Sequence, residues 1–450
     1  MTTFSVENFG CRATEADAAA LRRQLLARGL AQAQEHASAD VIVLNTCTVT
    51  AAADSQAREA VRKLHRANPR AQIIVTGCYA QRAPEEIASI EGVAWVVGNS
   101  HQSGIPQLVW DFAARGDREP RTVANAASPD FVPLAQLAEG EMSLARGPAK
   151  ILTGDIFAQT AVQIAPAGML AGDHTRPILK IQDGCNNRCS YCVIPFVRGL
   201  SRSLPPDTVV QEVRQLHDAG AKEIVLSGIN LGSYGRDLTP SAALPHLVRR
   251  ILDETAIEQL RFSSIEPQDV TEDFVSLIAA SDRLARHFHI PLQSGSDRVL
   301  RAMHRWYRAE HYAERVALIR RLLPDAAIGA DLIVGFPGET DADFRATCDF
   351  VERLPFTYLH VFSFSARPGT AARERTDTVA QSVVRERARE LRALGEKKSA
   401  EFRAAQAGRS VRALTLNRRG ENWTEALTGN YLKVRIAGVC PANEWHAVCL

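Results

Sequence analysis

The sequence predicts an α/β protein with an open parallel sheet, a partial TIM-like barrel of six strands, and a small β-barrel at the carboxyl end. Three observations predict this order. Strand-like runs alternate with amphipathic helical runs up to about residue 100, and again between about residues 176 and 375. Short strand-like runs separated by turns then follow residue 408. Cysteines and glycine-rich motifs recur where the strands end, the edge at which such sheets hold ligands.

Length and composition predict a cytoplasmic protein of several domains. The chain has 450 residues, of which 46% are hydrophobic and 23% charged, and its formal net charge is +2. That charge is too small to indicate nucleic-acid binding by itself. The first ten residues lack the basic start and apolar core of an export signal, and the apolar runs are too short to span a membrane. We therefore expect reduced thiols among the nine cysteines and no membrane partner.

The first region is expected to form a parallel sheet with helices on its faces. The expected strands cover residues 4–9, 41–46, 73–76 and 93–97, and the expected helices cover residues 15–28, 51–67 and a segment after residue 84. Cys11, Cys47 and Cys78 each follow one of the first three strands, so they could converge at the carboxyl edge of the sheet. Each cysteine alone could be a small buried hydrophobe, but three equivalent positions favour a shared site.

A long segment with weak periodicity separates this region from the barrel. Between about residues 113 and 176 Gly, Pro, Ala and Asp are common, and the segment is longer than an ordinary connection. It is predicted to be an interdomain linker packed along the surface, with a short ordered piece at residues 151–162.

The central region is predicted to be an open barrel with its chemistry at the carboxyl ends of the strands. The expected strands cover residues 178–182, 222–227, 259–264, 287–291, 328–334 and 357–362. The expected helices cover residues 207–219, 243–254, 271–280, 308–322 and 341–354. Cys348, within the last of these helices, is predicted to be a packed core residue.

The loop after the first barrel strand carries the sharpest motif of the chain. It contains Cys185, Cys189 and Cys192 in the spacing C-x₃-C-x₂-C, with Tyr191 before the third cysteine. Three thiolates on one short loop can hold three irons of a four-iron cluster and leave the fourth iron open to a ligand. The paired CxxC half-sites and downstream histidine pair that are typical of structural zinc are missing from this motif.

Polar and glycine-containing motifs lie at the next four barrel strands: SGINLGSYG after residue 226, SSIEP after 262, HIPLQSGS after 288 and DLIVGFPG after 330. Glycine at the first motif lets the backbone approach a ligand closely. Glu266 could accept a ribose hydroxyl or an ammonium group, and the alternative is a solvated loop carboxylate. Gln293 and Ser294 can point into the barrel mouth. His287 and His289 are expected to be one packed and one hydrogen-bonded residue rather than metal ligands.

Basic residues with aromatic neighbours follow two of these loops. They are Arg198, Arg202, Arg298, Arg301, His304, Arg305 and Arg308, with Trp306 and Tyr307 among them. Such a set suits phosphate contact and base stacking, and an ordinary solvated helix face is the alternative.

The carboxyl-terminal region begins with a charged helix at residues 383–407, which predicts a solvated face. Strands are expected at residues 411–416, 423–427, 431–436 and 445–450, a pattern that suggests a compact barrel of the oligonucleotide-binding kind. Cys440 and Cys449 are expected to be packed or unpaired.

The cysteine loop resembles the signature of radical S-adenosylmethionine (SAM) enzymes, and its surroundings, DGCNNRCSYCVIPFVRGLSRS, are similar to the methylthiotransferases. NFGCRATEAD, VLNTCTVTAAAD and VTGCYAQRAP resemble the three cysteine motifs of the amino-terminal domain of that family. LTGNYLKV resembles the core of the TRAM domain, an RNA-binding module. The resemblance implies a methylthiotransferase domain at residues 1–112, a linker at 113–170, a radical SAM domain at 171–405 and a TRAM-like domain at 406–450.

The resemblance also implies two [4Fe–4S] clusters and SAM as cofactors. Its cluster ligands carry over to Cys11, Cys47 and Cys78 for one cluster and to Cys185, Cys189 and Cys192 for the other. The expected SAM contacts are Ser227, Gly228, Glu266, Gln293 and Asp331. In this family one SAM methylates a sulfur held at the first cluster, and a second SAM supplies the radical that takes the C2 hydrogen of an adenine.

The implied substrate is N6-threonylcarbamoyladenosine at position 37 of tRNA, because NTCTVT and GCYAQ resemble that branch, although its usual GCKVN reads GCRATEAD here. The implied partners are the tRNA anticodon stem-loop, an electron donor such as flavodoxin or ferredoxin, and a sulfur donor. Related branches modify isopentenyladenosine in tRNA or an aspartate of a ribosomal protein. An RNA-binding iron–sulfur protein without radical chemistry is the alternative from another class.

Overall fold

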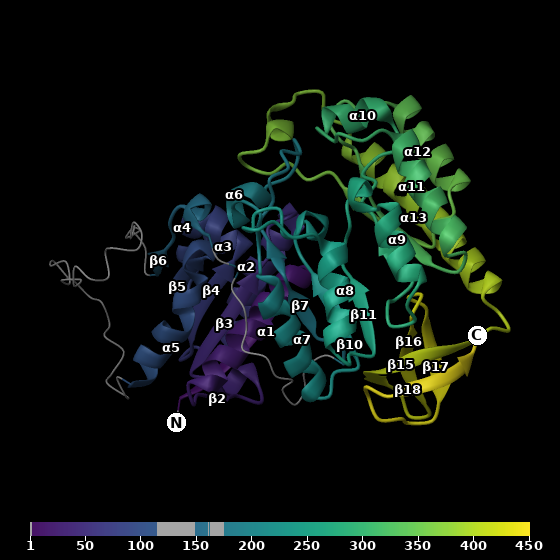
Figure 1. The fold of residues 1–450 in the computed structure, drawn as a ribbon. Helices are drawn as coiled ribbons and strands as arrows, with labels where there is room; N and C mark the ends of the chain where they lie inside the picture. Colours follow the sequence, from purple (N-terminus) through teal and green to yellow (C-terminus); the bar gives the residue numbers. More distant parts are fainter. Residues whose placement is uncertain (1, 115–148, 161, 163–174) are drawn as a thin grey trace. The chain divides into compact units, whose positions relative to one another are not determined.

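The computed structural model describes residues 2–114, 149–160, 162 and 175–450 (Figure 1). The chain divides into two compact units. Unit 1 comprises Met1–Pro166 together with Val193–Leu200, and unit 2 comprises Ala167–Cys192 together with Ser201–Leu450. The expected linker lies largely outside the described residues.

Unit 1 is built on a parallel sheet. Its strands run in the order β2 (Ala31–Gln32), β1 (Thr3–Phe9), β3 (Val41–Thr46), β4 (Gln72–Gly77), β5 (Val93–Gly98) and β6 (Lys150–Leu152). Its helices are α1 (Arg12–Ala27), α2 (Ala51–Ala67), α3 (Cys78–Arg82), α4 (Pro84–Ala88), α5 (Ile105–Ala114) and α6 (Ile194–Arg198). Short 3₁₀ turns lie at His36–Ser38, Asn99–Gly104 and Ile156–Ala158.

The core of unit 1 lies on both faces of this sheet. Every residue of β3 is buried, and successive side chains point to opposite faces. Ile42 and Leu44 pack with Val61 of α2, whereas Val43 packs with Leu21 of α1 on the other face. The predicted sheet is confirmed. Strands β2 and β6 and helix α5 are additions to the expected elements. Strand β6 overlaps the start of the short ordered piece expected at residues 151–162.

Unit 2 contains an open barrel of parallel strands. Strands β7 (Ile178–Lys180), β10 (Glu223–Ser227) and β11 (Gln259–Phe262) form one sheet, and β12 (His287–His289), β13 (Ala327–Val334) and β14 (Tyr358–Ser363) form the next. A parallel bridge between Ser264 and His289 continues one sheet into the other. A short antiparallel pair, β8 (Gln182–Asp183) with β9 (Arg202–Ser203), lies at the base of the cysteine loop. The partial TIM-like architecture is therefore confirmed.

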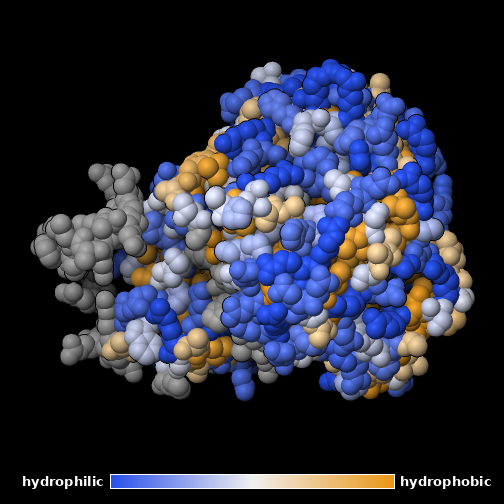
Figure 2. Space-filling view, viewed as in Figure 1, coloured by the Kyte–Doolittle hydropathy of each residue, from blue (hydrophilic) through white to orange (hydrophobic). Residues whose placement is uncertain are grey.

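Amphipathic helices cover the outside of these strands. They are α7 (Pro206–Asp218), α8 (Leu244–Glu254), α9 (Glu272–Ala279), α10 (Asp297–Ala302), α11 (Ala309–Leu322), α12 (Asp341–Arg353) and α13 (Gln381–Ala405). Further 3₁₀ turns lie at Leu231–Ser233, Pro267–Asp269 and Ala371–Glu374. In α8 the buried side chains follow the helical period (Leu244, Leu247, Val248 and Ile251). The visible surface over α10 to α13 is mostly hydrophilic, as expected for the outer faces of such helices (Figure 2).

The carboxyl-terminal strands form a curled antiparallel sheet, in the order β17 (Lys433–Ala437), β16 (Trp423–Thr428), β15 (Ser410–Arg419) and β18 (Trp445–Cys449). The charged helix α13 is more than the solvated face predicted from its sequence. It packs along β14, and its Arg387 is buried and paired with Glu339 at 2.7 Å. Among the described residues, none of the helices combines the length and apolarity needed to cross a membrane.

Candidate functional site

Three cysteines converge at the carboxyl edge of the sheet in unit 1. Cys11 is the residue that precedes α1, Cys47 directly follows β3, and Cys78 begins α3 after β4. The thiols of Cys11 and Cys47 are hydrogen-bonded to each other, and each interacts electrostatically with Cys78. Cys47 and Cys78 are buried, whereas Cys11 is exposed. The structure therefore brings these three cysteines together, as the sequence predicted.

The pKa values of these three thiols favour a single thiolate, on Cys11. The hydrogen bond from Cys47, with Arg198 and backbone N–H groups at the start of α1, lowers the pKa of Cys11 to about 5 against the opposing effect of desolvation at its thiol, although the residue as a whole is exposed. The same hydrogen bond and burial raise the pKa of Cys47. Burial also raises the pKa of Cys78, and Arg198 opposes that rise. Three clustered sulfur ligands fit an iron–sulfur cluster better than a hard cation.

Buried hydrogen bonds hold the strand ends that carry the cysteines. The side-chain amide of Asn45 on β3 donates to the carbonyl of Thr14 in the first turn of α1 at 2.7 Å. The hydroxyl of Thr46 donates to the carbonyl of Thr76 on β4 at 2.6 Å. These contacts fix the segment before Cys47 against its two neighbours.

A second network joins the residue after Cys47 to the helix that begins at Cys78. The hydroxyl of Thr48 donates to Asp54 at 2.6 Å, and Nε of Arg82 on α3 donates to the same hydroxyl at 2.8 Å. Arg82 and Asp54 also form an ion pair at 2.9 Å. The spacing of Cys47 and Cys78 is therefore set by side chains as well as by the sheet.

Arg198 is a site residue whose role the sequence did not indicate. Its Nε lies 3.2 Å from Sγ of Cys78, and its Nη2 is paired with Asp17 at 2.8 Å. Only 2% of Arg198 is exposed, so the prediction that it contacts phosphate is wrong. Asp17 had a detectable signal, because it lies on the apolar face of α1 between Ala13 and Leu21.

In unit 2 the buried side-chain amide of Gln182 holds the start of the cysteine loop in place. Nε2 of Gln182 donates to the carbonyls of Asp183 and Gly184 at 2.9 and 2.8 Å, and its Oε1 accepts from the backbone N–H of Asn230. The carboxylate of Asp183 accepts from the N–H of Gly184 and pairs with Lys180 at 2.8 Å. Arg202 also faces Asp183, at 3.7 Å, and is buried, so it does not offer the phosphate contact predicted for it.

The three loop cysteines are half-buried, and a buried arginine lies beside them. Nη1 of Arg305 is 3.4 Å from Sγ of Cys189, and Nη2 of the same side chain pairs with Glu266. Burial raises the pKa of Cys185, whereas hydrogen bonds from Asn187 and Asn230 lower it. Arg305 thus compensates negative charge at this loop, as a cluster of thiolate ligands requires, and it is not available for RNA.

The predicted SAM contacts lie on four neighbouring strands of the barrel. Ser227 ends β10, Glu266 follows β11 and Gln293 follows β12. Gly228 has no room for a side chain, because a Cβ there would lie 2.8 Å from Oε1 of Gln182. Burial raises the pKa of Glu266, and Arg305 partly offsets this effect. These residues share the carboxyl edge, whereas Asp331 lies within β13.

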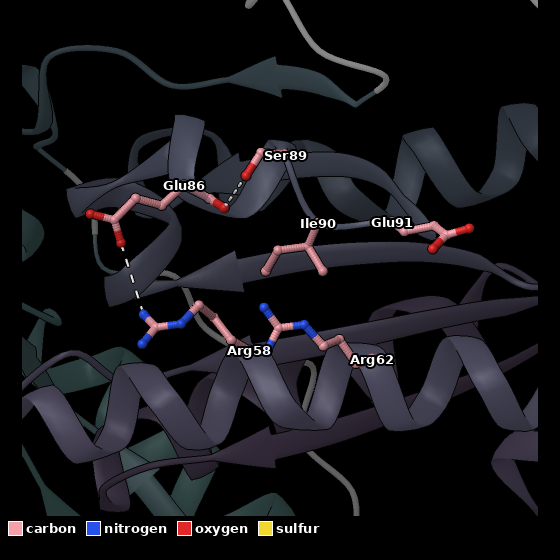
Figure 3. A pocket seen from close by; sticks show the side chains of 6 residues that line it. All are labelled: Arg58, Arg62, Glu86, Ser89, Ile90 and Glu91. Atoms are coloured by element: carbon pink, nitrogen blue, oxygen red, sulfur yellow. Dashed lines mark hydrogen bonds and ion pairs between the residues drawn. The ribbon is translucent and has the colours of Figure 1, made fainter.

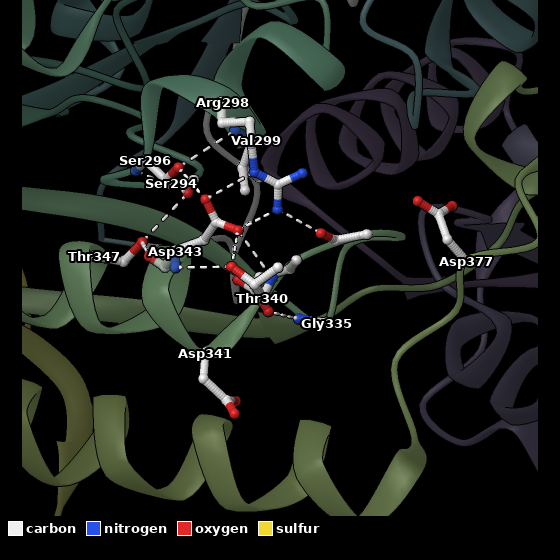
Figure 4. A network of polar contacts seen from close by, with 12 residues as sticks. Ser294, Ser296, Arg298, Val299, Gly335, Thr340, Asp341, Asp343, Thr347 and Asp377 are labelled. Carbon is white, nitrogen blue, oxygen red and sulfur yellow. Dashed lines mark hydrogen bonds and ion pairs between the residues drawn. The ribbon is translucent and has the colours of Figure 1, made fainter.

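A polar network fixes the loop that carries Gln293 (Figure 4). Gln293 has a φ of +67°, and the following Gly295 donates its N–H to Thr347 of α12 at 3.0 Å. Ser296 donates to Asp343 at 2.7 Å, and Arg298 pairs with the same carboxylate. The loop is therefore anchored to the first turns of α12, and Arg298 is engaged in that anchor.

The two barrel histidines are both hydrogen-bonded. His287 and His289 share the hydroxyl of Tyr358, at 2.8 and 3.0 Å, so the prediction that one is merely packed is wrong. Nε2 of His289 lies 3.0 Å from Oδ1 of Asp331, and Nδ1 of His360 lies 3.2 Å from the same oxygen. Asp331, predicted to contact SAM, is thus engaged by two imidazoles.

Exposure alternates along the basic segment after α10. Arg305 and Tyr307 are buried, whereas the intervening Trp306 is 60% exposed. Arg301, His304 and Arg308 are also exposed. The exposed residues therefore still combine an aromatic ring, which suits base stacking, with basic side chains, which suit phosphate contact.

Cys348 is half-buried, and its Sγ lies 3.9 Å from a carboxylate oxygen of Glu390, so it is not the core residue that the sequence predicted. Cys440 and Cys449 are free thiols, in agreement with the expectation that they are unpaired.

A surface hollow of about 420 Å³ lies between α2 and the α4–β5 turn of unit 1 (Figure 3). It is lined by Arg58, Arg62, Glu86, Ser89, Ile90 and Glu91. It contains none of the predicted site residues, and Arg58 is within 3.9 Å of Glu86 across it. The hollow lies along the helices of unit 1 rather than among the cysteines.

Residues 179–351 match the Radical SAM superfamily, and residues 3–98 match the Uncharacterized protein family UPF0004. The threonylcarbamoyladenosine tRNA methylthiotransferase MtaB of Aquifex aeolicus is 34% identical over 432 residues, covering 96% of both chains. The tRNA-2-methylthio-N(6)-dimethylallyladenosine synthase of Syntrophobacter fumaroxidans is 33% identical, covering 97% of this chain and 90% of its own.

Among solved structures, the radical SAM methyltransferase TsrM from Kitasatospora setae, with cobalamin and a [4Fe-4S] cluster bound, has a TM-score of 0.56 at 16% identity. The match covers 83% of this chain and 77% of that one, and it supports the fold alone. The sequence matches confirm the family resemblance drawn from the cysteine motifs, and with it SAM and an iron–sulfur cluster as cofactors.

Proposed function

The chain belongs to the radical SAM methylthiotransferases that modify tRNA, and from this premise we propose that it adds a methylthio group to C2 of N6-threonylcarbamoyladenosine at position 37 of tRNA. The observation that carries the proposal is the presence of two sets of three cysteines. One set is the group of three cysteines that converge in unit 1, and the other is the C-x₃-C-x₂-C loop of unit 2. A methylthio transfer by this chemistry needs a place to generate a radical and a place to hold sulfur.

We assign one four-iron cluster to Cys11, Cys47 and Cys78, and one to Cys185, Cys189 and Cys192, each with an iron left open. When bound at the second set, the cluster supplies the electron for the reductive cleavage of SAM, which is the source of the hydrogen-abstracting radical. The protein's own residues neutralise and orient these ligands. Arg305 neutralises charge beside Cys189, and Arg198 does the same beside Cys78.

SAM is proposed to lie along the carboxyl edge of the barrel. Ser227, Gly228 and Gln293 offer backbone and side-chain groups there, and Glu266 offers a carboxylate held by Arg305. Asp331 offers a second carboxylate deeper in the barrel. These assignments give the ligand polar groups from four adjacent strands, the usual composition of a barrel site.

The tRNA anticodon stem-loop is proposed to contact the exposed segment after α10 and the carboxyl-terminal sheet. Trp306 offers a stacking surface for a base, and Arg301 and Arg308 offer charge to phosphates. The enzyme would act in the cytoplasm, with an electron donor such as flavodoxin or ferredoxin and a separate sulfur donor.

The threonylcarbamoyl substrate is supported by the Aquifex relative and by the NTCTVT and GCYAQ motifs. The second candidate is a dimethylallyladenosine-type substrate, which the Syntrophobacter relative favours at nearly the same identity. The two substrates differ at N6 of the adenine. The discriminating groups must therefore contact the N6 substituent rather than C2.

The test uses protein with its clusters reconstituted without oxygen, together with SAM and reductant. It is given tRNA that carries either threonylcarbamoyladenosine or dimethylallyladenosine, and the nucleosides are analysed by mass spectrometry. The proposal predicts the methylthio product from the first tRNA alone. A product from the second tRNA alone would assign the other substrate.

The cysteine variants separate the two cluster assignments. Cys185→Ala is expected to abolish release of 5′-deoxyadenosine from SAM, because it removes a ligand of the radical-generating cluster. Cys78→Ala is expected to retain SAM cleavage, to lose roughly half of the iron, and to give no methylthio product. Wild-type protein that holds iron and binds tRNA but never cleaves SAM would instead be an RNA-binding iron–sulfur protein.

A further inference from the structure

A cluster of two histidines and one aspartate lies inside the barrel of unit 2, and the proposed reaction assigns no role to its imidazoles. This His–Asp–His cluster consists of His289 on β12, Asp331 on β13 and His360 on β14. The three strands are hydrogen-bonded neighbours, and Asp331 and His360 are paired in register. The cluster is therefore built by regular strands rather than by mobile loop side chains.

Two of the three distances between its ligand atoms match the separation of ligands around a small cation. The nitrogens of His289 and His360 lie 3.0 and 3.2 Å from Oδ1 of Asp331, and all three atoms lie within 4.8 Å of one another. With metal–ligand bonds of roughly 2.0–2.2 Å, neighbouring ligand atoms are separated by about 3.0–3.5 Å. The distances from both nitrogens to Oδ1 of Asp331 therefore fall within the range found between ligands of one ion.

The histidine in the interior also has the outer partner that is usual for a metal ligand. Nδ1 of His289 lies 3.0 Å from the hydroxyl of Tyr358, which in turn lies 2.8 Å from Nε2 of His287. A metal-bound imidazole is typically oriented in this way by a hydrogen bond at its other nitrogen. Tyr358 can take this position because residue 329 is glycine, where a Cβ would lie 1.9 Å from the tyrosine ring.

Charge and access agree with the geometry. Nε2 of His289 and Nδ1 of His360 both face Oδ1 of Asp331, so the carboxylate lies between two imidazoles. The side chain of His289 is 7% exposed, that of Asp331 24%, and that of His360 53%. The cluster is thus anchored on one side and open to solvent on the other.

We propose that His289, Asp331 and His360 bind a divalent first-row transition ion, with the remaining coordination positions open to water or to an oxygen of the substrate. Two imidazoles and one carboxylate with open positions are a known ligand set for such ions. This site would be separate from both cysteine sets, but it shares Asp331 with the proposed SAM contacts and assigns that carboxylate to the ion instead. It does not depend on the identity of the modified nucleoside.

The test measures binding of Co²⁺ to the protein with its iron–sulfur clusters reconstituted, after passage over a chelating resin. Equilibrium dialysis followed by elemental analysis gives cobalt and iron in the same sample. We expect one equivalent of cobalt with the iron content unchanged. X-ray absorption at the cobalt edge should show nitrogen and oxygen neighbours without sulfur.

The variants are His360→Ala, which removes an exposed ligand, and Asp331→Asn, which keeps the shape of the side chain. Each is expected to weaken cobalt binding at least tenfold while the iron content stays near wild type. His246→Gln, an exposed histidine on α8, is the matched control and should bind cobalt normally. Wild-type protein that binds no cobalt, binding that is equal in all variants, or sulfur ligation of the cobalt would each overturn the proposal.

Discussion

At the scale of single residues, Gly77 sets how closely the ends of β3 and β4, which precede Cys47 and Cys78, approach each other. Its φ is +98°, and a Cβ at this position would lie 2.4 Å from the carbonyl oxygen of Thr46. Both the backbone conformation and the contact therefore require glycine. Gly29 has a similar φ of +79° but nothing within 4 Å of the added atom, so it isolates the cost of the conformation alone.

We predict that Gly77→Ala lowers the free energy of unfolding by about 3 kcal/mol, because it adds a backbone clash to the strain of a positive φ. Gly29→Ala should cost only about 1 kcal/mol. Chemical denaturation of the two variants measures the difference. Equal losses would show that β3 and β4 can separate at little cost, and that the glycine does not set the approach of the two cysteines.

Arg198 provides the second prediction at this scale. Arg198→Gln leaves Asp17 buried without its cation, and it removes a hydrogen bond donor from Sγ of Cys78. We expect a loss of about 3–5 kcal/mol in stability. In cluster-loaded protein we expect a lower reduction potential for the cluster proposed at Cys11, Cys47 and Cys78, because donors to ligand sulfur raise that potential. Denaturation of the apoprotein and a potentiometric titration of the loaded protein measure the two effects.

The controls separate charge from sulfur contact. The double variant Asp17→Asn with Arg198→Gln removes the buried charge that Arg198 neutralises, so it should regain part of the stability but not the reduction potential. Arg198→Lys keeps the charge but lacks the planar fork that reaches both partners. A potential that is unchanged in all three variants would mean that Arg198 serves folding alone.

At the scale of elements, the sequence identified most strands and helices because their apolar period is strong. The run VIVLNT predicted β3 to the residue, and α2 coincides with its expected range. Short elements such as β2 and β6 were missed, since two or three residues carry no period and form only by pairing with a neighbour.

The candidate site was predictable to the extent that its residues follow strands. Cys11, Cys47 and Cys78 were expected together because parallel strands end at one edge. Arg198 and Arg305 were not recognised as buried, because their partners Asp17 and Glu266 are far away in sequence. The sequence alone does not distinguish an arginine that pairs with a residue so far along the chain from an arginine that is exposed to solvent.

The first turn of α12 gives a pH-dependent prediction for one element. Burial raises the pKa of Asp343, but hydrogen bonds from Arg298, Thr340 and Ser296 outweigh it and lower the pKa far below its ordinary value. Since the folded pKa is depressed, this stabilisation is complete above the unfolded pKa of about 4 and is lost as the pH falls below it. We expect Asp343→Asn to cost about 2 kcal/mol at pH 7 and progressively less below pH 4.

Denaturation midpoints between pH 3 and pH 7 test this expectation. Asp341→Asn is the matched control, because Asp341 begins the same helix but its side chain is 92% exposed. It should cost less than about 1 kcal/mol. A deficit of Asp343→Asn that stayed constant with pH would assign its effect to lost packing rather than to the charge.

At the scale of the whole molecule, a buried arginine joins the carboxyl-terminal sheet to the barrel within unit 2. Arg261 on β11 pairs with Glu223 at 2.7 Å and donates to the carbonyls of Thr428 and Gly429, each at 3.1 Å. Tyr431 then stacks on His287 with ring centroids 4.1 Å apart. The carboxyl-terminal sheet, proposed above to contact tRNA, is thereby tied to the strands that carry the proposed SAM site.

We predict that Arg261→Met destabilises unit 2 by about 3–5 kcal/mol, because Glu223 is left buried with only Arg176 near it. We also expect faster proteolysis near residues 406–410, since the carboxyl-terminal sheet loses its hydrogen bonds to the barrel. Arg412→Met, an exposed position on β15, should change neither result. Thermal melting and limited trypsin digestion provide the measurements.

The double variant Glu223→Gln with Arg261→Met decides between the two effects of Arg261. It no longer has the Glu223 carboxylate that Arg261→Met leaves without its nearer cation, so its melting temperature should recover in part. If Arg261 is the link between sheet and barrel, proteolysis near residue 408 should stay fast in the double variant. If digestion instead returns to the wild-type rate, the sheet is held by the stacking of Tyr431 on His287, and Arg261 contributes by balancing the charge of Glu223.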